Sequence, residues 1–491
     1  METLTVKASK KLCCATAAEI TLAAIEKENS TMNQPDSTFS RRSFLRRAAV
    51  ATAAFHVLPG YVLGLNGQTP PSRKLNIAGV GVGGMGGNNI KRCSETENIV
   101  ALCDIDPNYA AKTFKAHPGA KVYMDFHEML EKQKDIEAVV IATPDHNHAV
   151  VAMACMKAGK HVYVQKPLAH SVNEVRAMTE AARKYKVITQ MGNQGRSGEG
   201  ARMVCEWLWA GAIGNVREIH AWTNRPVWPQ GIEVGRPEAE PVPQGMDWDK
   251  WIGPAPFRPF NHAYHPGNWR AWCDFGTGSL GDLGCHILDC VFWSMKLKYP
   301  TSVEGCISTY WRDLWKVVEP KNENFPRSTI VRYAFPKRDS MPAVNLTWWD
   351  GGMMPPRPVE LEEGRQMGNS DGGVLFIGDK GKLICGCFGE SPRLIPDAKM
   401  KAFKRPAKTL ERVPGGKEGH EKDWIRACKD GKPACSSFDF SGPLSEMVLM
   451  GNLAVRYPNR RLFWDGEKME VTNDKQANSY VKRTYREGWT L

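Results

Sequence analysis

Short apolar segments alternate with stretches of helical periodicity from residue 74 to about residue 195. Each apolar segment is rich in β-forming residues and too short for a buried helix, so the pattern predicts strands of a sheet covered on both faces. The predicted strands are 75–80, 98–103, 138–142 and 162–164. Because strand and helix alternate regularly, we expect a parallel sheet of the doubly wound type.

The turn after the first predicted strand contains glycines at the spacing GxGxxG. Gly81, Gly83 and Gly86 fall in "GVGVGGMGG", directly before a predicted helix. Glycine is needed there because a Cβ atom would block the tight turn or the approach of backbone N–H groups to a pyrophosphate. The second strand ends at Asp104, whose carboxylate can accept hydrogen bonds from an adenosine ribose, and Asp106 follows instead of an arginine. The pattern therefore predicts NAD binding and disfavours NADP.

Polar residues follow the predicted strands at the ends where ligands gather in parallel sheets. Lys166 is unusual because lysine is rarely buried, yet it directly follows a buried strand that Pro167 prevents from continuing. Together with the glycine turn and Asp104, we expect the following residues to contact the cofactor: Thr143, Pro144, Asn147, His148, Gln165, Lys166 and Asn193.

The segment 282–293 has the pattern of a helix with one apolar face. Asp282 and His286 are four residues apart and share a side of this helix. A carboxylate beside an imidazole raises the imidazole pKa and fixes its orientation, which suits a general acid or base near neutral pH. Taken alone, such a pair is also typical of a solvated surface or of half a metal site. A metal centre that includes His148 is a further alternative, although no third ligand has fitting spacing.

The first 63 residues have a different character. The motif "SRRSFLR" is followed by the apolar stretch "AAVATAAFHVL", which resembles a bacterial twin-arginine export signal. We expect initiation at Met32 and export of the folded protein to the periplasm. No apolar run approaches the roughly 20 residues of a membrane span, so no stable span is expected after processing. The predicted segments are an extension with the signal (1–63), a linker (64–73), a dinucleotide-binding domain (74–195) and a second domain (196–491).

Composition narrows the function classes. The chain has 491 residues, 42% of them hydrophobic, and a formal net charge of +12. Basic residues are scattered among acidic ones and form no dense block with interleaved aromatic residues, so nucleic-acid binding is not expected. The 14 cysteines include no CxxC pair, which disfavours a zinc ribbon or a thioredoxin-like site. Folding before export would leave these cysteines without need of disulfide partners.

Together, these motifs resemble the Gfo/Idh/MocA oxidoreductase family, especially its exported sugar-dehydrogenase-like branch. The resemblance runs from residue 74 to the end of the chain and rests on "GVGGMG", "CDIDP", "TPDHNHA", "QKPLAHS", "GNQGRSGEG", "WTNRP" and "GDLGCHILD". It implies a Rossmann NAD-binding domain followed by an α/β domain with an open, mostly antiparallel sheet. It also implies assembly into a homodimer or homotetramer through that sheet.

By this resemblance, Lys166 matches the lysine of the family's EKP motif, and Asp282 and His286 match its DxxxH pair. These three are the predicted catalytic residues. His286 takes a hydroxyl proton, Lys166 donates a hydrogen bond to the same oxygen, and Asp282 holds His286 in position. Gln165 stands where the family has glutamate, so one negative charge beside Lys166 is missing.

The segment before the 282–293 helix offers groups that can contact a substrate. Tryptophan rings pack against the C–H faces of sugars, but they are equally typical of cores, and both interpretations stay open. The expected substrate contacts are Tyr264, His265, Trp269 and Arg270.

The sequence therefore predicts NAD-dependent hydride transfer between nicotinamide and a hydroxyl-bearing carbon of a sugar or polyol. Two alternatives stay open. One is a glycosidase that retains NAD and works by transient oxidation and elimination. The other is a non-catalytic sugar or nucleotide sensor on the same scaffold. The expected partners are a small carbohydrate and further copies of the chain.

Overall fold

The computed structural model describes residues 73–231, 235–318 and 323–491, which belong to one unit that begins at Arg73. The predicted export signal, Met32 and the linker up to residue 72 lie outside these residues. Within the described ranges, no helix has the length and apolar character needed to cross a bilayer.

The first sheet has six parallel strands in the order β3-β2-β1-β4-β5-β6. All four residues of β4 are buried, as expected for a central parallel strand between helical layers. The strands are β1 (Asn76–Val80), β2 (Asn98–Cys103), β3 (Lys121–Tyr123), β4 (Ala138–Ile141), β5 (His161–Val164) and β6 (Thr189–Met191). The helices between them are α3 (Gly84–Cys93), α4 (Pro107–Ala116), α5 (Phe126–Lys132), α6 (Asp145–Lys157) and α7 (Val172–Tyr185).

The second sheet has nine strands in the order β15-β14-β13-β7-β12-β11-β8-β16-β17. Only β7 and β12 pair in parallel, so the predicted open, mostly antiparallel sheet is confirmed. Its strands are β7 (Val216–Thr223), β8 (Ser302–Ile307), β11 (Thr329–Phe335), β12 (Val344–Trp349), β13 (Gly372–Gly378), β14 (Gly381–Gly386), β15 (Arg393–Ile395), β16 (Arg461–Asp465) and β17 (Glu470–Val471). A separate hairpin is formed by β9 (Tyr310–Asp313) and β10 (Lys316–Val318).

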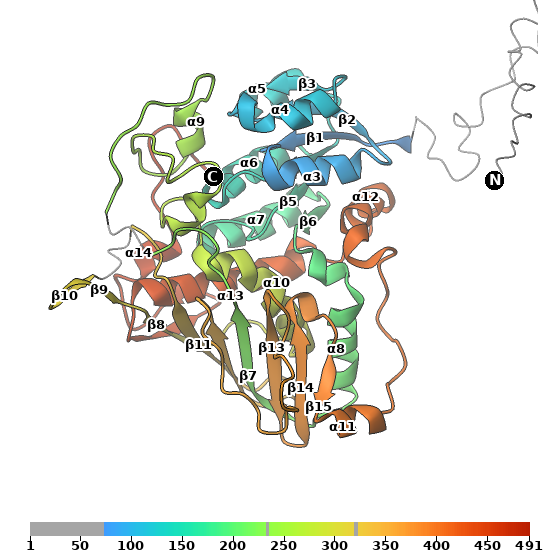
Figure 1. Cartoon of the computed structure of the whole chain (residues 1–491). Coiled ribbons are helices and arrows are strands. Elements are labelled where there is room, and N and C mark those ends of the chain that lie inside the picture. Colours follow the sequence, from blue (N-terminus) through green and yellow to red (C-terminus); the bar gives the residue numbers. More distant parts are fainter. Residues whose placement is uncertain (1–72, 232–234, 319–322) are drawn as a thin grey trace, which may run out of the picture. The chain divides into compact units, whose positions relative to one another are not determined.

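Helices form the layer between the two sheets (Figure 1). The helix α13 (Phe438–Arg456) packs against α7 of the first half and against α10 (Gly278–Ser294) of the second, and both α13 and α10 contact strands of the second sheet. One hydrophobic core runs through this layer, from Val164 of β5 to Leu346 of β12. The two halves are therefore joined by a shared core, which fixes the face that each presents to the other.

The remaining helices cover the periphery. They are α8 (Glu199–Trp209), α9 (Trp248–Ile252), α11 (Asp397–Ala402), α12 (His420–Asp430) and α14 (Asn478–Val481). The helix α12 returns to the first half, because Trp424 packs in a cluster with Val82 and Ile90. The predicted division into domains 74–195 and 196–491 therefore does not show that α12 packs against the first domain.

Candidate active site

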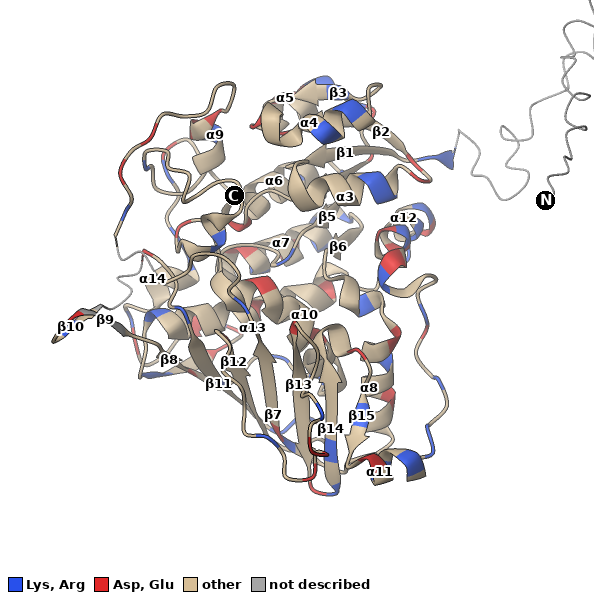
Figure 2. Ribbon diagram, in the orientation of Figure 1, with Lys and Arg blue, Asp and Glu red and all other residues tan. Residues whose placement is uncertain are grey.

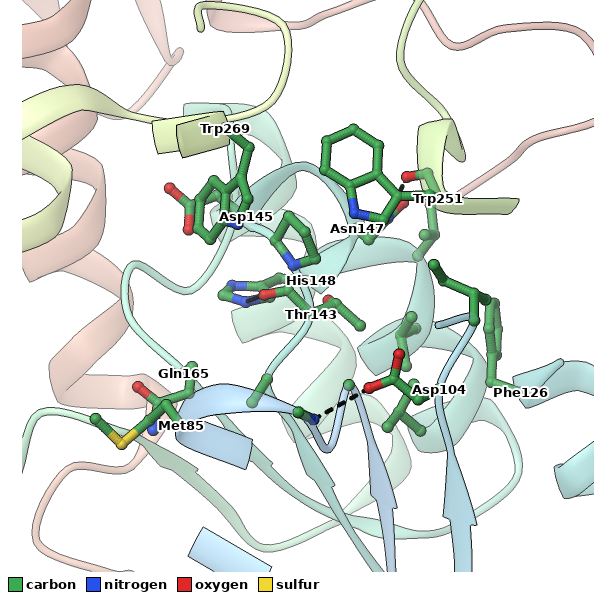
Figure 3. A pocket seen from close by; sticks show the side chains of 18 of the residues that line it. Met85, Asp104, Phe126, Thr143, Asp145, Asn147, His148, Gln165, Trp251 and Trp269 are labelled. Atoms are coloured by element: carbon green, nitrogen blue, oxygen red, sulfur yellow. Dashed lines mark hydrogen bonds between the residues drawn. The ribbon is translucent and has the colours of Figure 1, made fainter. Parts of the chain in front are cut away.

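A cavity of about 770 Å³ lies at the carboxyl ends of the first sheet, within the range of ligand sites (Figure 3). Its walls come from both halves of the chain. Fourteen of the residues singled out in the sequence line it: Gly81, Gly83, Asp104, Thr143, Pro144, Asn147, His148, Gln165, Lys166, His265, Trp269, Arg270, Asp282 and His286.

Three predicted contact residues lie elsewhere. Gly86 is in α3, where a Cβ atom would overlap the carbonyl oxygen of Gly81, so its lack of a side chain permits the turn itself. Tyr264 is 1% exposed and packs edge-on against Trp272 and Phe275 in an aromatic cluster. Asn193 is fully buried, and both ends of its amide are bonded to protein. For these residues the structure supports packing or positioning instead of direct contact with a ligand in the cavity.

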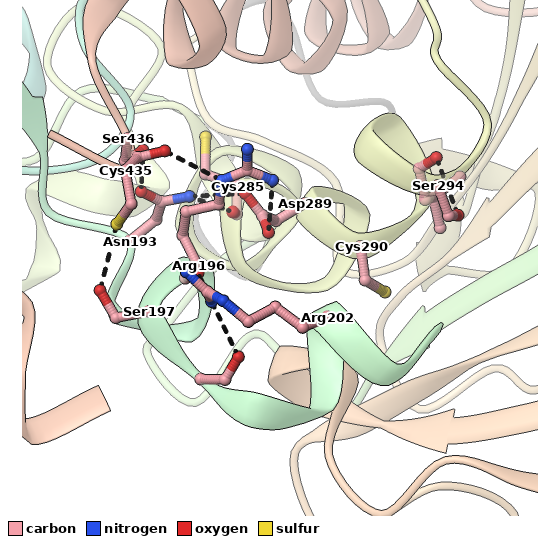
Figure 4. A network of polar contacts seen from close by, with 12 residues as sticks. Asn193, Arg196, Ser197, Arg202, Cys285, Asp289, Cys290, Ser294, Cys435 and Ser436 are labelled. Atoms are coloured by element: carbon pink, nitrogen blue, oxygen red, sulfur yellow. Dashed lines mark hydrogen bonds and ion pairs between the residues drawn. The ribbon is translucent and has the colours of Figure 1, made fainter. Parts of the chain in front are cut away.

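Asn193 belongs to a buried set of polar residues outside the cavity lining, here called the Asn193 network (Figure 4). Its Nδ2 donates to Asp289 Oδ1 over 3.0 Å, and its Oδ1 accepts a 2.6 Å hydrogen bond from Ser436 Oγ. Arg196 lies 4.0 Å from Asp289 and is stacked between the rings of Trp293 and Phe440. The network also includes Ser197 and His420, whose Oγ and Nδ1 atoms are 2.7 Å apart.

The glycine turn has the geometry that a dinucleotide requires. Gly81 has φ +75°, and a Cβ atom there would lie 2.7 Å from the backbone nitrogen of Thr143. No side chain caps the N-terminus of α3, and its first turn contains no acidic residue. Free N–H groups at a helix N-terminus favour an anion, so this end of the cavity fits a pyrophosphate.

Asp104 stands at the edge of the same turn. Its Oδ2 accepts hydrogen bonds from the N–H groups of Val82 and Gly83, over 2.8 and 3.1 Å. Burial raises the pKa of Asp104 to about 6, so the carboxyl group is mainly ionised at neutral pH. Beside it, His265 Nε2 lies 2.9 Å from Asp106 Oδ2, which puts His265 near the predicted ribose site. The sequence predicts a substrate contact for His265, whereas this contact places it beside Asp106.

Four buried polar atoms of cavity-lining residues lack a partner among the described residues, and two of them follow β4: Thr143 Oγ1 and Asn147 Oδ1. The amide of Asn147 is held by its other end, which donates to the carbonyl oxygen of Trp251 over 2.9 Å. Buried polar atoms without partners are costly and usually mark a missing water or ligand. Both atoms follow β4, where a dinucleotide would pass, so the donor set fits NAD.

Lys166 forms a close ion pair with Asp282 at the cavity wall. Its Nζ donates to Asp282 Oδ1 over 2.6 Å and to the backbone oxygen of Asp282 over 2.8 Å. Burial alone would raise the pKa of Asp282, but the Lys166 ammonium and the Arg270 guanidinium outweigh it and hold the pKa at about 2. Asp282 is therefore ionised and keeps Lys166 at the cavity wall.

His286 differs from the prediction in two respects. In the described part of the chain its Nδ1 has no hydrogen-bond partner, whereas Asp282 binds Lys166, so Asp282 does not hold the imidazole. Burial and the Lys166 charge lower the pKa of His286 to about 3 and outweigh the Asp282 carboxylate. The imidazole is therefore neutral at pH 7. Its ring packs edge-on against Phe388, with centroids 4.9 Å apart.

The two histidines of the "TPDHNHA" motif, His146 and His148, each lie between two backbone carbonyl oxygens. The ring nitrogens of His148 lie 2.8 Å from the carbonyl oxygens of Pro167 and Thr143, and those of His146 lie 3.1 and 2.9 Å from the oxygens of Phe275 and Trp251. His148 therefore lines the cavity while it ties together the ends of β4 and β5. No group of three or more metal-ligating side chains exists within the described ranges, so His148 forms no metal centre there with Asp282 and His286.

Gln165 connects the cavity to α12. Its Nε2 donates to Asn89 Oδ1 over 2.9 Å, and Asn89 Nδ2 donates to the buried Glu421 over 2.6 Å. A glutamate at position 165 would bring a second carboxylate to this chain of hydrogen bonds. This gives a physical reason for the amide, since two buried carboxylates repel each other.

Among the cavity residues that received no role from the sequence are Asp145, Arg225 and Phe388. Arg225 lies in "WTNRP", so the motif was the available signal for it. Phe388 has φ +63°, a strained conformation for a bulky residue, and only the glycines beside it hint at a special turn. Asp145 is buried and accepts a 2.5 Å hydrogen bond from Thr277.

Comparison with known proteins matches this architecture. Residues 75–193 match the family model described as oxidoreductase family, NAD-binding Rossmann fold (Gfo/Idh/MocA). Residues 218–307 match the companion model described as oxidoreductase family, C-terminal alpha/beta domain.

Inositol 2-dehydrogenase of Serratia proteamaculans is 29% identical over 183 residues, which are 36% of this chain and 54% of that protein. Inositol 2-dehydrogenase of Salmonella typhimurium is 32% identical over 146 residues, which are 29% of this chain and 43% of that protein. The chain thus spans about half the length of the curated relatives it matches.

Solved structures show the same fold at low sequence identity. The WlbA dehydrogenase of Bordetella pertussis, in complex with NADH and UDP-GlcNAcA, has a TM-score of 0.55 at 17% identity, over 80% of this chain and 99% of that one. A levoglucosan dehydrogenase in complex with NADH and levoglucosan has a TM-score of 0.52 at 17% identity, over 79% of this chain and 99% of that one.

Proposed function

Because this chain belongs to the Gfo/Idh/MocA family of oxidoreductases, we propose that it transfers hydride between NAD and a hydroxyl-bearing carbon of a sugar or polyol. The observation that carries the proposal is one cavity that contains the glycine turn, Lys166 and His286 together. NAD, when bound, supplies the hydride acceptor, so that a CH–OH group and NAD⁺ become a carbonyl group, NADH and a proton. The relatives named inositol 2-dehydrogenase and the levoglucosan complex support this substrate class.

The residues of the chain supply the proton transfer and the electrostatics. His286 lines the cavity and is neutral, so its imidazole accepts the hydroxyl proton of the substrate. The Lys166 ammonium stabilises the negative charge that develops on the same oxygen. Asp282 positions Lys166 instead of His286, because its carboxylate is bonded to the ammonium. Phe388 packs against the imidazole ring and limits its rotation.

The carboxylate of Asp104 supports NAD as the cofactor. A ribose 2′-hydroxyl can donate to this carboxylate, whereas the 2′-phosphate of NADP would meet like charge. Asp106 adds a second carboxylate nearby, since its backbone N–H donates to Asp104 over 3.0 Å.

The test begins with mass spectrometry of the protein released from its native compartment, to detect NAD that co-purifies with it. Incubation with NAD and a panel of sugars and polyols, followed by NADH absorbance, then measures oxidation. Absence of NADH formation with every substrate would contradict the proposal. Release of an aglycone from a chromogenic glycoside without added NAD would indicate the NAD-retaining glycosidase, and NAD binding without any turnover would indicate a sensor.

We also propose export by the twin-arginine route into the periplasm, on the basis of "SRRSFLR" and the apolar stretch after it. Replacement of Arg41 and Arg42 by lysine is expected to retain the protein in the cytoplasm, as cell fractionation would show. N-terminal sequencing of the expressed protein tests the start at Met32, and a first residue upstream of Met32 would refute it.

We propose assembly into a homodimer or homotetramer through the second sheet. In β11, buried residues alternate with more exposed ones, so one face of the strand is less covered than the other. Light scattering of the purified protein measures the mass, and a monomer at micromolar concentration would contradict this proposal.

A further inference from the structure

Three cations surround one carboxylate at the wall of the cavity. Lys166 Nζ lies 2.6 Å from Asp282 Oδ1, Arg270 Nε lies 3.3 Å from the same oxygen, and Arg225 Nε lies 3.7 Å from Asp282 Oδ2. All four side chains line the cavity. One carboxylate compensates only one of these charges, so further negative charge is required nearby.

The described residues supply only part of that charge. Arg225 Nη1 also lies 3.2 Å from Asp371 Oδ1, which compensates a second cation. Asp145 is the remaining carboxyl group near Lys166 and Arg270, and burial raises its pKa to about 7, so it is only about half ionised at neutral pH. His286 and His148 are neutral, because burial lowers their pKa values to about 3 and about 4. This region therefore has an excess of up to one positive charge.

Both guanidinium groups present unused donors. Arg270 is held by stacking, with its Cζ 4.3 Å from the centre of the Trp269 ring, and its Nη1 donates to the carbonyl oxygen of Gly267 over 3.3 Å. Arg225 is held through Nη1, which donates to Asn224 Oδ1 over 2.6 Å. Among the described residues, neither Nη2 atom has a hydrogen-bond partner. The side chains are 33% and 21% exposed, so a molecule in the cavity can reach them.

We propose that the substrate of this oxidoreductase is a sugar acid, whose carboxylate is bound by Arg225 and Arg270. The inference rests on the proposed function and names the substrate class of the same site. A planar carboxylate matches the fork of a guanidinium group, and both groups are already held in place before binding. A single negative charge is enough to compensate an excess of at most one positive charge. A phosphomonoester, with a charge of about −1.5 to −2 at pH 7, would exceed it.

Matched pairs of substrates test the proposal. The NAD-loaded protein is assayed with glucose and glucuronate, galactose and galacturonate, and glucose 6-phosphate. We expect kcat/KM for an acid to exceed that for its neutral partner by about 10- to 100-fold, since charged hydrogen bonds are gained. Equal or better use of the neutral sugars would overturn the proposal. Preference for glucose 6-phosphate over the acids would also overturn it, because the site would then bind a phosphate group instead of a carboxylate.

The variants Arg225→Gln and Arg270→Gln locate the effect. Each is expected to lower the ratio of kcat/KM for the acid to kcat/KM for its neutral partner by about 10-fold or more. Arg461→Gln is the matched control, because Arg461 lies in β16, outside the cavity, and pairs with Glu304 over 3.3 Å. Equal losses with both substrates would indicate a structural role for the arginines and refute the inference.

Binding separates this inference from the proposed function. Thermal shifts of the NAD-loaded protein are measured with a panel of uronates and aldonates and with the neutral sugars. Stabilisation by an acid that Arg270→Gln abolishes and Arg270→Lys partly restores supports the carboxylate site, even if no sugar is oxidised. A panel in which no acid stabilises the protein overturns the inference, whereas oxidation of neutral sugars would then leave the proposed function standing.

Discussion

The cavity and the Asn193 network contain the same kinds of side chain in different states. Both combine carboxylates, cations and histidines from both halves of the chain. Figure 3 shows the carboxylates Asp104 and Asp145 and the imidazole of His148 in the cavity, and Figure 4 shows Asp289 and Arg196 in the network. In the cavity, Thr143 and His286 keep polar atoms without partners among the described residues, and the arginine forks are open. In the network, Asn193 and Ser197 are hydrogen-bonded to neighbours. Arg196 Nη1 and Asp289 Oδ2 have no hydrogen-bond partner among the described residues but face each other over 4.0 Å, and none of the network members lines the cavity.

The difference shows that residue type alone does not identify a site. Arg196 lies between two aromatic rings and its side chain is 8% exposed. Arg270 lies 4.3 Å from the centre of the Trp269 ring and 6.0 Å from that of Trp228, and its side chain is 33% exposed. A packed cation contributes to a defined geometry, and a cation that faces a cavity can bind a ligand. Along the ribbon, basic and acidic residues are interspersed in both halves, so the charge pattern by itself does not separate the two regions (Figure 2).

The largest expected effect is on turnover, from Lys166→Met. Loss of the ammonium removes stabilisation of the developing negative charge, so kcat should fall about 10³-fold, while NAD binding stays within a few fold. Stopped assays with saturating sugar and NAD measure kcat. Lys382→Met is the control, because Lys382 pairs with Glu360 over 2.6 Å outside the cavity. Unchanged turnover in Lys166→Met would contradict the conclusion that the cavity, and not the Asn193 network, carries the reaction.

The second effect is on stability, from Asp289→Ala in the network. The change leaves Arg196 buried without its carboxylate, so the free energy of unfolding should fall by about 3–5 kcal/mol. Denaturant unfolding measures the loss, and Asp289→Asn, which keeps an acceptor for Asn193, is the milder control. Turnover of the folded variant should change only a few fold. A loss of kcat as large as that of Lys166→Met, with stability intact, would place the network in the reaction.

A smaller effect is expected on cofactor binding, from Asp104→Asn. The amide accepts hydrogen bonds less strongly than the carboxylate, so NAD affinity should fall about 10-fold. The preference for NAD over NADP should shrink as well, because the like charge opposite a 2′-phosphate is gone. Isothermal titration with both dinucleotides measures the two affinities. An unchanged ratio would show that Asp104 serves the glycine turn and not the choice of cofactor.

The smallest effect is on the pH dependence of stability, from His420→Gln. Burial lowers the pKa of His420 to about 4, so between about pH 4 and 6.5 the unfolded chain binds more protons than the folded protein. Its contribution to stability is therefore lost as the pH falls through this window, by at most about 1.4 kcal/mol per pH unit.

Buried carboxyl groups with a raised pKa, such as Asp145, act in the opposite direction, so the informative quantity is the difference between variant and parent. Urea unfolding at several pH values measures the free energy of unfolding. We expect it to fall less steeply with decreasing pH in the variant than in the parent. An identical pH dependence would mean that the pKa of His420 is not lowered by burial.

Local sequence patterns were sufficient for the fold class and for part of the site. The strands, the glycine turn, Asp104 and Lys166 could be predicted because each depends on a few neighbouring residues and on the rule that ligands lie at the carboxyl ends of parallel strands. The spacing of Asp282 and His286 correctly gave one helix, α10. It did not show which partner Asp282 chooses, since Lys166 lies 116 positions away in the chain.

The sequence by itself determined the type of fold, the NAD-binding signature and the candidate lysine and histidine, because short-range periodicity and turn chemistry encode them. Only the tertiary structure decided which polar residues face the cavity. It placed Asn193 in a buried hydrogen-bond network and paired Asp282 with Lys166. It also brought Arg225 and Phe388 to the cavity wall. The reason is physical: burial and pairing of charges depend on contacts between distant segments, which form only when the shared core joins the two halves.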